Sequence, residues 1–224
     1  MFQRWKDLLF LHWKWDADEI QRTLPAGLTV DTFDGAAWLG VVPFFMHSIR
    51  PAMLPPVPWL SYFLELNVRT YVVDARGRPG VWFYSLDCNR IIAVWLARNR
   101  FHLPYEHASM RATRGAGAVD YHSRRRGAEN ASHFAYRPAA APLEAPPGSL
   151  EFFLVERYRL FAADGARIFS GRVHHPPYQL SKTTVDASRT DLFSLNGFSD
   201  PGRPADHVIG SPGVSVSVYA LGAD

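Results

Sequence analysis

The stretch FLELNVRTYVV, residues 63–73, carries polar and apolar side chains in alternation. Successive side chains of a β-strand point to opposite faces of a sheet. As a strand, this stretch places four polar residues on one face: Glu65, Asn67, Arg69 and Tyr71. That face either meets water or lines the interior of a barrel or cleft. In the second case Glu65 and Arg69 are able to pair with each other or to hold a ligand.

Several other segments also have the pattern of strands joined by turns. Residues 63–73 and 80–87 flank the loop DARGRP, and residues 151–162 and 166–175 flank Asp164-Gly165, so we expect two hairpins. Residues 28–46 carry β-branched and aromatic side chains on both sides of Asp34-Gly35, and residues 213–221 alternate valine with serine. The Arg-rich residues 111–134 are interpreted as a strand pair with a basic loop, and the Pro/Ala-rich residues 137–149 as a connector. The sequence therefore predicts a mainly β protein.

Two helices are predicted. The first covers DADEIQRTL, residues 16–24, with Asp16 or Asp18 as the N-cap and Pro25 beyond its end.

The second helix covers NRIIAVWLARNRF, residues 89–101, with Asn89 as the expected N-cap and Pro104 as the stop. Its apolar stripe leads to Arg98, which is therefore expected to point towards the core and to need a partner there.

The composition limits the class of protein. With 224 residues and 47% hydrophobic content, the chain is long enough for one sizeable core, and we expect a single domain over residues 1–224. Only three of the 24 basic residues are lysine, at positions 6, 14 and 182, which leaves 21 arginines. Because imine chemistry needs a desolvated lysine amine, the chain has few candidates for it.

The single cysteine, Cys88, fits a reducing compartment and is expected to be a small buried residue rather than a nucleophile. The N-terminal segment lacks the pattern of a signal peptide, and no run of 18 apolar residues occurs. We expect a cytoplasmic protein without a membrane partner.

Common catalytic and nucleotide-binding motifs are missing, among them the nucleophile elbow, the phosphate loop and the zinc-protease helix. The run Arg124-Arg125-Arg126 has no interleaved aromatic residues, so we interpret it as a solvated loop rather than a nucleic-acid contact. The expected partner is a small molecule, with no nucleic acid and no cofactor, and formation of a homo-oligomer stays open.

The segment EFFLVERYRLFA, residues 151–162, is predicted to be a strand that places Glu156 on a strongly apolar face. Burial of a carboxylate is costly unless it is paired, and desolvation raises its pKa. Glu156 is therefore either an acid/base group or one half of a structural ion pair, with Arg98 as a partner.

His174 and His175 suggest a metal site, but adjacent residues of a strand point to opposite faces. No motif fixes a site that combines them with His102, His107 or Glu156, and we expect no metal. Either histidine is able to cap a turn or to bind in a pocket, and His174 is taken as a substrate-binding candidate.

An ordered set of segments resembles the YqjF-like family of uncharacterised bacterial proteins. The set comprises LPAGLTVDTFDGAAWLGVVPFFM, FLELNVRTYVV, GVWFYSLD, ARNRFHLPYEHASM, VERYRLF and VHHPPYQL, from about residue 8 to about residue 190. The resemblance implies the acetoacetate decarboxylase-like fold, a closed β-barrel with a few flanking helices and an internal apolar cavity.

The resemblance also implies where a site lies. In the decarboxylases a segment similar to Arg-Glu-x-x-Gly-Phe-Pro-Lys-Lys carries the imine-forming lysine. Laid over RNRFHLPYE, its arginine falls on Arg98, its proline on Pro104 and its two lysines on Tyr105 and Glu106. Glu65 falls near a site glutamate of those enzymes. Imine formation is therefore not expected, because neither Tyr105 nor Glu106 has an amine.

Three functions are compatible with these patterns. The first is a lyase- or hydrolase-like acid/base enzyme for a small carboxylate or keto-acid-like substrate, without an imine. Its catalytic candidates are Glu65, Tyr105, Glu106 and Glu156, and its substrate-binding candidates are Arg69, Arg98, His107 and His174. The second is a non-catalytic binding protein for an apolar metabolite, and the third is a scaffold whose cavity is filled by its own side chains.

Overall fold

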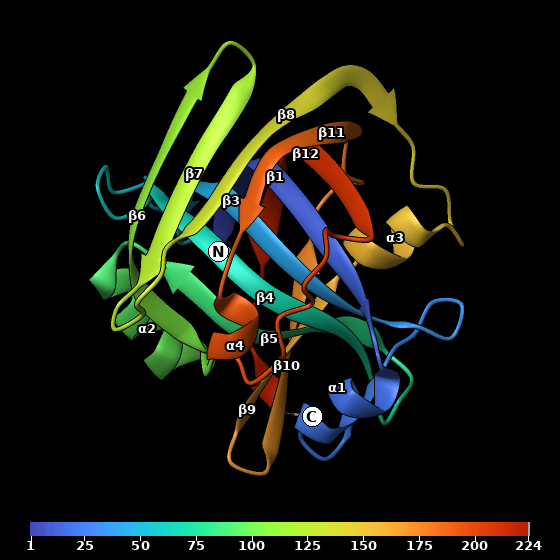
Figure 1. Cartoon of the computed structure of the whole chain (residues 1–224). Coiled ribbons are helices and arrows are strands. Elements are labelled where there is room, and N and C mark those ends of the chain that lie inside the picture. Colours follow the sequence, from blue (N-terminus) through green and yellow to red (C-terminus); the bar gives the residue numbers. More distant parts are fainter. Residues whose placement is uncertain (224) are drawn as a thin grey trace.

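The computed structural model describes residues 1–223; Asp224, the last residue of the predicted domain, lies outside the described residues. Strands dominate, with short helices between them (Figure 1). The strands are β1 (Phe2–Trp15), β2 (Leu28–Val30), β3 (Ala37–Arg50), β4 (Phe63–Asp74), β5 (Pro79–Cys88), β6 (Tyr105–Gly115), β7 (Ala118–Arg125), β8 (Ser132–Leu143), β9 (Arg159–Asp164), β10 (Arg167–His174), β11 (Leu180–Arg189), β12 (His207–Val218) and β13 (Gly222–Ala223). The helices are α1 (Ala17–Thr23), α2 (Ile91–Phe101), α3 (Leu150–Val155) and α4 (Leu192–Leu195).

Within the described residues the strands form one 13-stranded sheet that closes on itself. The sheet forks at β5, which pairs with β4 on one side and with both β6 and β9 in parallel on the other. It forks again at β12, which pairs with β1, β10 and β11. Two rings result, and they share the strands β5, β4, β3, β1 and β12. The first ring is completed by β6, β7, β8 and β11, and the second by β9 and β10.

The strand β4 and the central parts of β1 and β3 are buried on both faces. In β1, Leu8 and Phe10 belong to one hydrophobic core, whereas Leu9 and Leu11 belong to the other. The strands β3 and β4 divide between the two cores in the same alternating way. The second core is filled by aromatic residues of β7, β8 and α4. The polar residues of β4 point to the first core, in the ring closed by β9 and β10.

The helix α1 confirms the first helix prediction. It begins after Asp16, whose side chain accepts a hydrogen bond from the Glu19 backbone amide at 2.8 Å. The helix α2 begins after Arg90 without a side-chain cap. Asn89 was expected to cap α2 but instead accepts a hydrogen bond from the Leu64 backbone amide at 3.0 Å. Among the described residues, none of the helices is both long and apolar enough to cross a bilayer.

The prediction of one strand over residues 151–162 is wrong. The first half forms the helix α3, whose N-cap Ser149 accepts a hydrogen bond from the Phe152 backbone amide, and only residues from Arg159 onwards form β9. A short apolar run fits a helix as well as a strand, and the serine cap decides between them. The Asp164-Gly165 turn between β9 and β10 is confirmed.

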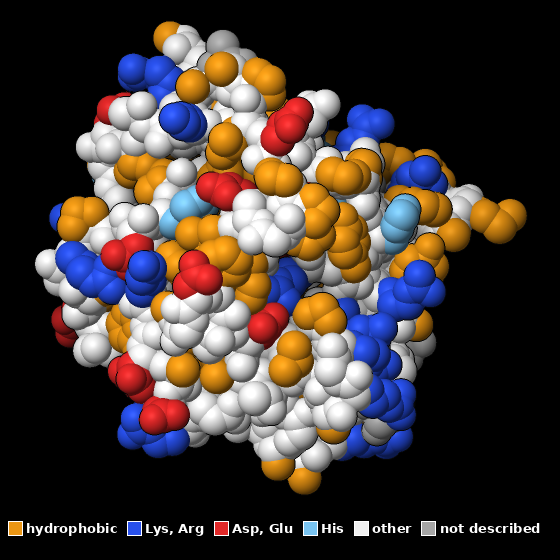
Figure 2. Space-filling model, turned by 90° about the vertical axis from the view of Figure 1, so that its right-hand side faces the viewer, with side chains coloured by type: hydrophobic (Ala, Val, Ile, Leu, Met, Phe, Trp, Pro, Cys, Tyr) orange, Lys and Arg blue, Asp and Glu red, His pale blue; other side chains and the backbone are white. Residues whose placement is uncertain are grey.

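The two weakly patterned segments contain more strand than expected. The Pro/Ala-rich connector is largely the end of β8, which continues to Leu143. The arginine run is not a solvated loop throughout, because Arg125 ends β7 and pairs with the buried Asp87 at 2.8 Å. Lys and Arg side chains gather along the right-hand edge of the face in Figure 2, with hydrophobic side chains over its middle.

Gly213 controls the pairing of β1 with β12, which both rings need. Its φ is +141°, and an added Cβ would lie 2.3 Å from the Trp5 carbonyl oxygen. We expect Gly213→Ala to lower the free energy of unfolding by about 2 kcal/mol, measured by urea denaturation. Gly115→Ala is the control, because open space surrounds that position and its φ is not positive. Equal effects of the two substitutions would contradict this account of the β1 and β12 junction.

Candidate functional site

A cavity of about 400 Å³ lies inside the ring that β9 and β10 close. Its wall is mostly apolar and comes from β1, β3, β4, β5, β9, β10, the helix α2 and the segment 51–61, which connects β3 to β4. Three polar side chains of β4 enter this wall on one face of the strand: Glu65, Asn67 and Arg69. They are 3%, 4% and 8% exposed, respectively. The polar face of residues 63–73 therefore lines an interior and does not meet bulk water.

Glu65 is a buried carboxyl group inside this cavity. Burial raises its pKa to about 7, while hydrogen bonds from Tyr105 and Asn67 oppose the rise. The Tyr105 hydroxyl donates to Glu65 Oε2 at 2.7 Å. Burial beside Glu65 also raises the pKa of Tyr105 well above its ordinary value, which keeps the phenol protonated. At neutral pH Glu65 therefore populates both its acid and its base form, next to a permanent donor.

Arg69 is buried at the same wall without an acidic partner. Its Nη2 donates to the Leu154 carbonyl oxygen at 3.1 Å and to the Tyr71 hydroxyl at 3.4 Å, and its Nε has no hydrogen-bond partner. Among residues 1–223, no carboxylate lies within ion-pairing distance of this guanidinium. A buried cation without a counter-ion is costly, so the position is suited to an anionic ligand. Asn67 Oδ1 is a second buried polar atom without a partner.

Neutral aromatic groups and a histidine pack behind the guanidinium. The Arg69 guanidinium carbon lies 5.3 Å from the Phe10 ring centre and 5.6 Å from that of Tyr71. His12 Nε2 is hydrogen-bonded to the Tyr71 hydroxyl at 2.8 Å. Burial, and then the positive charge of Arg69, lower the pKa of His12 well below its ordinary value. The imidazole is thus held neutral and adds no second positive charge to the site.

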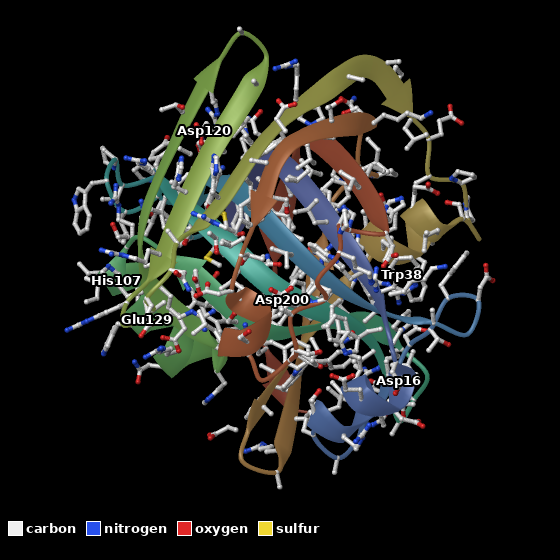
Figure 3. All side chains as sticks on the ribbon, viewed as in Figure 1. Asp16, Trp38, His107, Asp120, Glu129 and Asp200 are labelled. Carbon is white, nitrogen blue, oxygen red and sulfur yellow. The ribbon has the colours of Figure 1, made fainter. Side chains whose placement is uncertain are left out.

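The segment after α2 divides between the inside and the outside of the ring. Tyr105 begins β6 and lines the cavity, while Glu106 points outwards, as the alternation of a strand requires. The prediction that Arg98 points to the core is wrong. Its side chain is 48% exposed and pairs with Glu106 at 2.7 Å. His107 is half-buried and does not line the cavity; Figure 3 shows it at the end of β6 nearest α2.

Glu156 is buried, as expected, but it ends the helix α3 instead of lying on a strand. Its Oε1 accepts from the Tyr178 backbone amide at 2.8 Å, and its Oε2 accepts from the Tyr158 hydroxyl. The carboxylate thus joins α3 to the segment that follows β10 without an arginine partner, and it does not line the cavity. These contacts favour the structural interpretation of Glu156 over the catalytic one.

The two adjacent histidines point to opposite sides, as the strand geometry predicts. His174, the substrate-binding candidate, is exposed and outside the cavity, whereas His175 is buried and lines it. The His175 ring stacks on Tyr158 with centres 4.6 Å apart, and its Nδ1 lies 2.9 Å from the Pro176 carbonyl oxygen. The sequence pattern gave the opposition of the two rings but not which one faces inwards.

Sequence reasoning missed several lining residues that come from distant parts of the chain. Arg157 lines the cavity and pairs with Asp31 at 2.7 Å. Arg159 also lines it and donates to the Ser170 hydroxyl at 3.1 Å. Arg157 follows the C-cap of α3 and Arg159 begins β9, and such positions carry no periodic signal in the sequence. Their place in the wall is set by the packing of the β9 and β10 hairpin.

Neither a lysine amine nor a cysteine thiol is found among the described residues of this wall. None of the described lining residues is a lysine, and all three lysines of the chain are exposed. Cys88 is fully buried, and burial raises the pKa of its thiol to about 12, so the thiolate is scarce at neutral pH. The cavity is therefore equipped for carboxyl, phenol and guanidinium chemistry.

Solved structures with the acetoacetate decarboxylase-like fold resemble this architecture. Acetoacetate decarboxylase from Legionella pneumophila is 10% identical, with a TM-score of 0.66 over 100% of this chain and 86% of that chain. The enduracididine biosynthesis enzyme MppR, solved in complex with pyruvate, is 14% identical, with a TM-score of 0.65 over 100% and 89%. These TM-scores over the whole chain establish the fold, which is mainly β and acetoacetate decarboxylase-like, as the sequence resemblance implied.

The chain belongs to the DUF2071 family of uncharacterized conserved proteins, whose family model matches residues 2–215. The uncharacterized protein YqjF of Bacillus subtilis (strain 168) is 38% identical over 202 residues, which cover 90% of this chain and 83% of YqjF.

The raised pKa of Glu65 makes stability depend on pH. The folded state keeps the proton up to a pKa of about 7, whereas an unfolded glutamate loses it near 4.5. The stabilisation is therefore present below pH 4.5 and is lost as pH rises to about 7. Relative to Glu65→Gln, we expect the wild-type free energy of unfolding to fall by about 3 kcal/mol across this window. Urea denaturation at each pH measures it, and parallel profiles for the two proteins would contradict the assignment.

Tyr105→Phe tests the hydrogen bond to Glu65 separately. Because the phenol stabilises the carboxylate, its removal should move the pKa of Glu65 further up, which ¹³C NMR of the labelled carboxyl group can follow. Tyr84→Phe is the matched control, since the Tyr84 hydroxyl contacts Thr23 and lies outside the cavity. A pKa of Glu65 that is unchanged or lowered in Tyr105→Phe would remove Tyr105 from the acid/base pair.

Proposed function

We propose that this protein binds a small, largely apolar carboxylate in the cavity and acts on it by acid/base chemistry, without an imine intermediate. The observation that carries the proposal is the arrangement of Glu65, Asn67 and Arg69 on one face of β4. The apolar wall thus carries three polar groups in a row: an ionisable carboxyl, an amide oxygen without a hydrogen-bond partner, and a guanidinium without a carboxylate partner.

The spacing of these groups sets the size of the ligand. Residues four apart on a strand are separated by about 13 Å between Cα atoms, and side chains shorten the usable length. A carboxylate at Arg69 would place the body of a medium-length ligand beside Asn67 and its far end near Glu65. A hydroxyl or amide group beside Asn67 would satisfy its unpartnered oxygen. Most of the remaining wall is apolar, with Arg157, Arg159 and His175 as further polar lining residues.

The acid/base step rests on Glu65 and Tyr105. A carboxyl with a pKa of about 7 is able to accept a proton from a substrate and return it at neutral pH. The Tyr105 hydroxyl, hydrogen-bonded to Glu65, would orient that carboxyl. A lyase- or hydrolase-like reaction fits this pair. Tyr105 occupies the position where the resemblance to the decarboxylases puts a lysine, and the lysines of this chain are exposed, so an imine is not part of the proposal.

Structural neighbours support a carboxylate ligand. MppR is described in complex with pyruvate, and a decarboxylase of acetoacetate shares the fold, so both names refer to small keto acids.

The second candidate function is non-catalytic binding of an apolar metabolite, which the apolar wall favours. The scaffold alternative requires a filled interior, and the open cavity does not support it.

Arg69→Met tests carboxylate binding by calorimetry with a panel of medium-chain carboxylic acids and keto acids, each paired with its methyl ester. We expect the acids to bind the wild type. Arg69→Met should lower the affinity for the acids about 10- to 100-fold and change the affinity for the esters little. Stability should stay equal or rise, because a buried uncompensated charge is removed. Arg98→Met is the control outside the cavity. Equal binding of acids and esters to the wild type would contradict the role of Arg69.

A second measurement separates catalysis from binding. Substrate panels incubated in D₂O and followed by ¹H NMR report proton exchange or bond cleavage, and we expect Glu65→Gln to abolish either change while ligand affinity is kept. Binding without any chemical change in the wild type would favour the non-catalytic candidate.

Borohydride should not trap a keto acid on the protein; a covalent adduct would refute the imine-free chemistry.

A further inference from the structure

A group of metal-ligating side chains lies on the outer face of β7 and β8, away from the cavity. Asp120 and His122 are two residues apart on β7, so they share a face, and His133 is the cross-strand partner of His122 on β8. Tyr121, between the first two, points the other way and is fully buried. Figure 3 shows Asp120 on the hairpin of β6 and β7, which projects at the upper left of the molecule.

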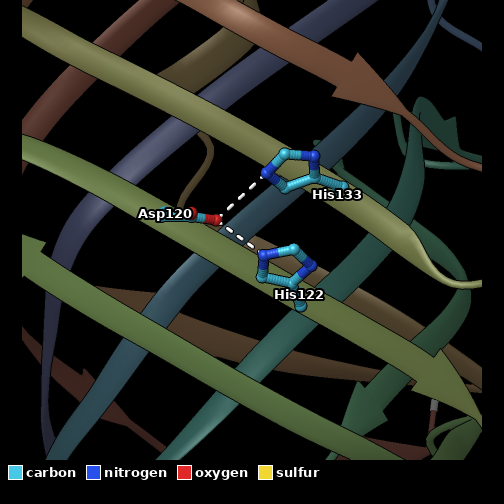
Figure 4. Close-up of side chains that lie close together, drawn as sticks. All are labelled: Asp120, His122 and His133. Carbon is cyan, nitrogen blue, oxygen red and sulfur yellow. Dashed lines mark hydrogen bonds and ion pairs between the residues drawn. The ribbon is translucent and has the colours of Figure 1, made fainter.

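The ligand atoms of these residues already converge. His122 Nε2 lies 2.8 Å and His133 Nε2 lies 3.0 Å from the same oxygen, Asp120 Oδ1 (Figure 4). The two imidazole rings are stacked with centres 4.2 Å apart and an angle of 7° between their planes. The three potential ligand atoms all lie within 4.8 Å of one another. The strand pairing therefore fixes a two-histidine, one-carboxylate arrangement before any ion arrives.

We propose that Asp120, His122 and His133 form a binding site for a divalent transition-metal ion, best fitted by Zn²⁺. Imidazole nitrogen and carboxylate oxygen are ordinary Zn²⁺ ligands, and three protein ligands leave one position open to solvent. Bonds of about 2 Å to each ligand require only small side-chain movements from the present hydrogen-bonded geometry. The carboxylate would exchange its two imidazole contacts for the ion.

Two arginines flank the site and favour an anion as the additional ligand of the metal ion. Arg111 of β6 is the cross-strand neighbour of His122, and Arg189 of β11 is the cross-strand neighbour of His133. The row across four strands thus reads Arg, His, His, Arg on one face. Both guanidinium groups repel a cation and weaken its binding, and both attract an anion. The open metal position is therefore suited to a small anion as the fourth ligand.

The experiment is a titration of the full, untagged protein with Zn²⁺ by calorimetry, repeated with Co²⁺ by visible absorption. We expect one ion per chain, with affinity lowered about tenfold or more in each of His122→Ala, His133→Ala and Asp120→Asn. His174→Ala is the control, because His174 is exposed and ends β10, which pairs with β9, β12 and β13 and not with β7 or β8. Co²⁺ in a four-coordinate site should give intense visible bands, and these bands should vanish in the same three variants.

Arg189→Gln and Arg111→Gln provide a test that misfolding cannot imitate. Removal of a flanking positive charge should raise Zn²⁺ affinity several-fold, and the gain should shrink at high salt. Wild-type protein that binds no Zn²⁺, or that binds it equally well without His122 and His133, would overturn the proposal. Unchanged affinity in both arginine variants would place any bound ion elsewhere. Cavity variants such as Glu65→Gln should leave Zn²⁺ affinity unaltered, which separates this site from the proposed function.

Discussion

The burial of both faces of β4 is the constraint on which the rest of the structure depends. Because β4 is shared by two closed rings, neither of its faces reaches bulk water. One face is apolar and joins the filled core, with Leu66 and Val68 fully buried. The opposite face carries Glu65 and Arg69, and these polar groups must be accommodated inside the protein. A cavity on that side lets a ligand or water solvate groups that a packed core would leave without partners.

Charge compensation distinguishes Arg69 from other buried charges of the protein. Asp87 is paired with Arg125, and Arg157 with Asp31, so these buried charges are balanced within the fold. Arg69 has no such partner among the described residues, and Glu65 relieves its own burial through a raised pKa. Stability alone favours apolar residues at both places. Uncompensated polarity of this kind is typical of functional sites, where part of the stability is given up for binding or chemistry.

The segment that follows α2 divides between the cavity and the outside of the protein. Its first strand residue, Tyr105, enters the cavity and contacts Glu65, whereas Glu106 turns outwards to Arg98. The family resemblance places lysines at these two positions in the decarboxylases. A shared fold at low identity does not transfer a reaction, so the residues of this chain have to be judged by their own chemistry. Tyr105 and Glu65 are groups that can transfer a proton, whereas the lysine of the decarboxylases attacks as an amine.

The sequence by itself determined the alternation of β4, the start of α1 at Asp16 or Asp18, and the scarcity of lysine, because these follow from local patterns and from composition. Local patterns also misled: the apolar run before Glu156 fits a helix or a strand, and the serine cap selected the helix. Only the tertiary structure decided which face of β4 is enclosed, which histidine of the pair turns inwards, and that Arg98 lies outside. It likewise brought His133 beside Asp120 and His122. These contacts depend on strand pairings between distant segments, and such pairings are set by closure of the whole sheet and leave no periodic signal in the chain.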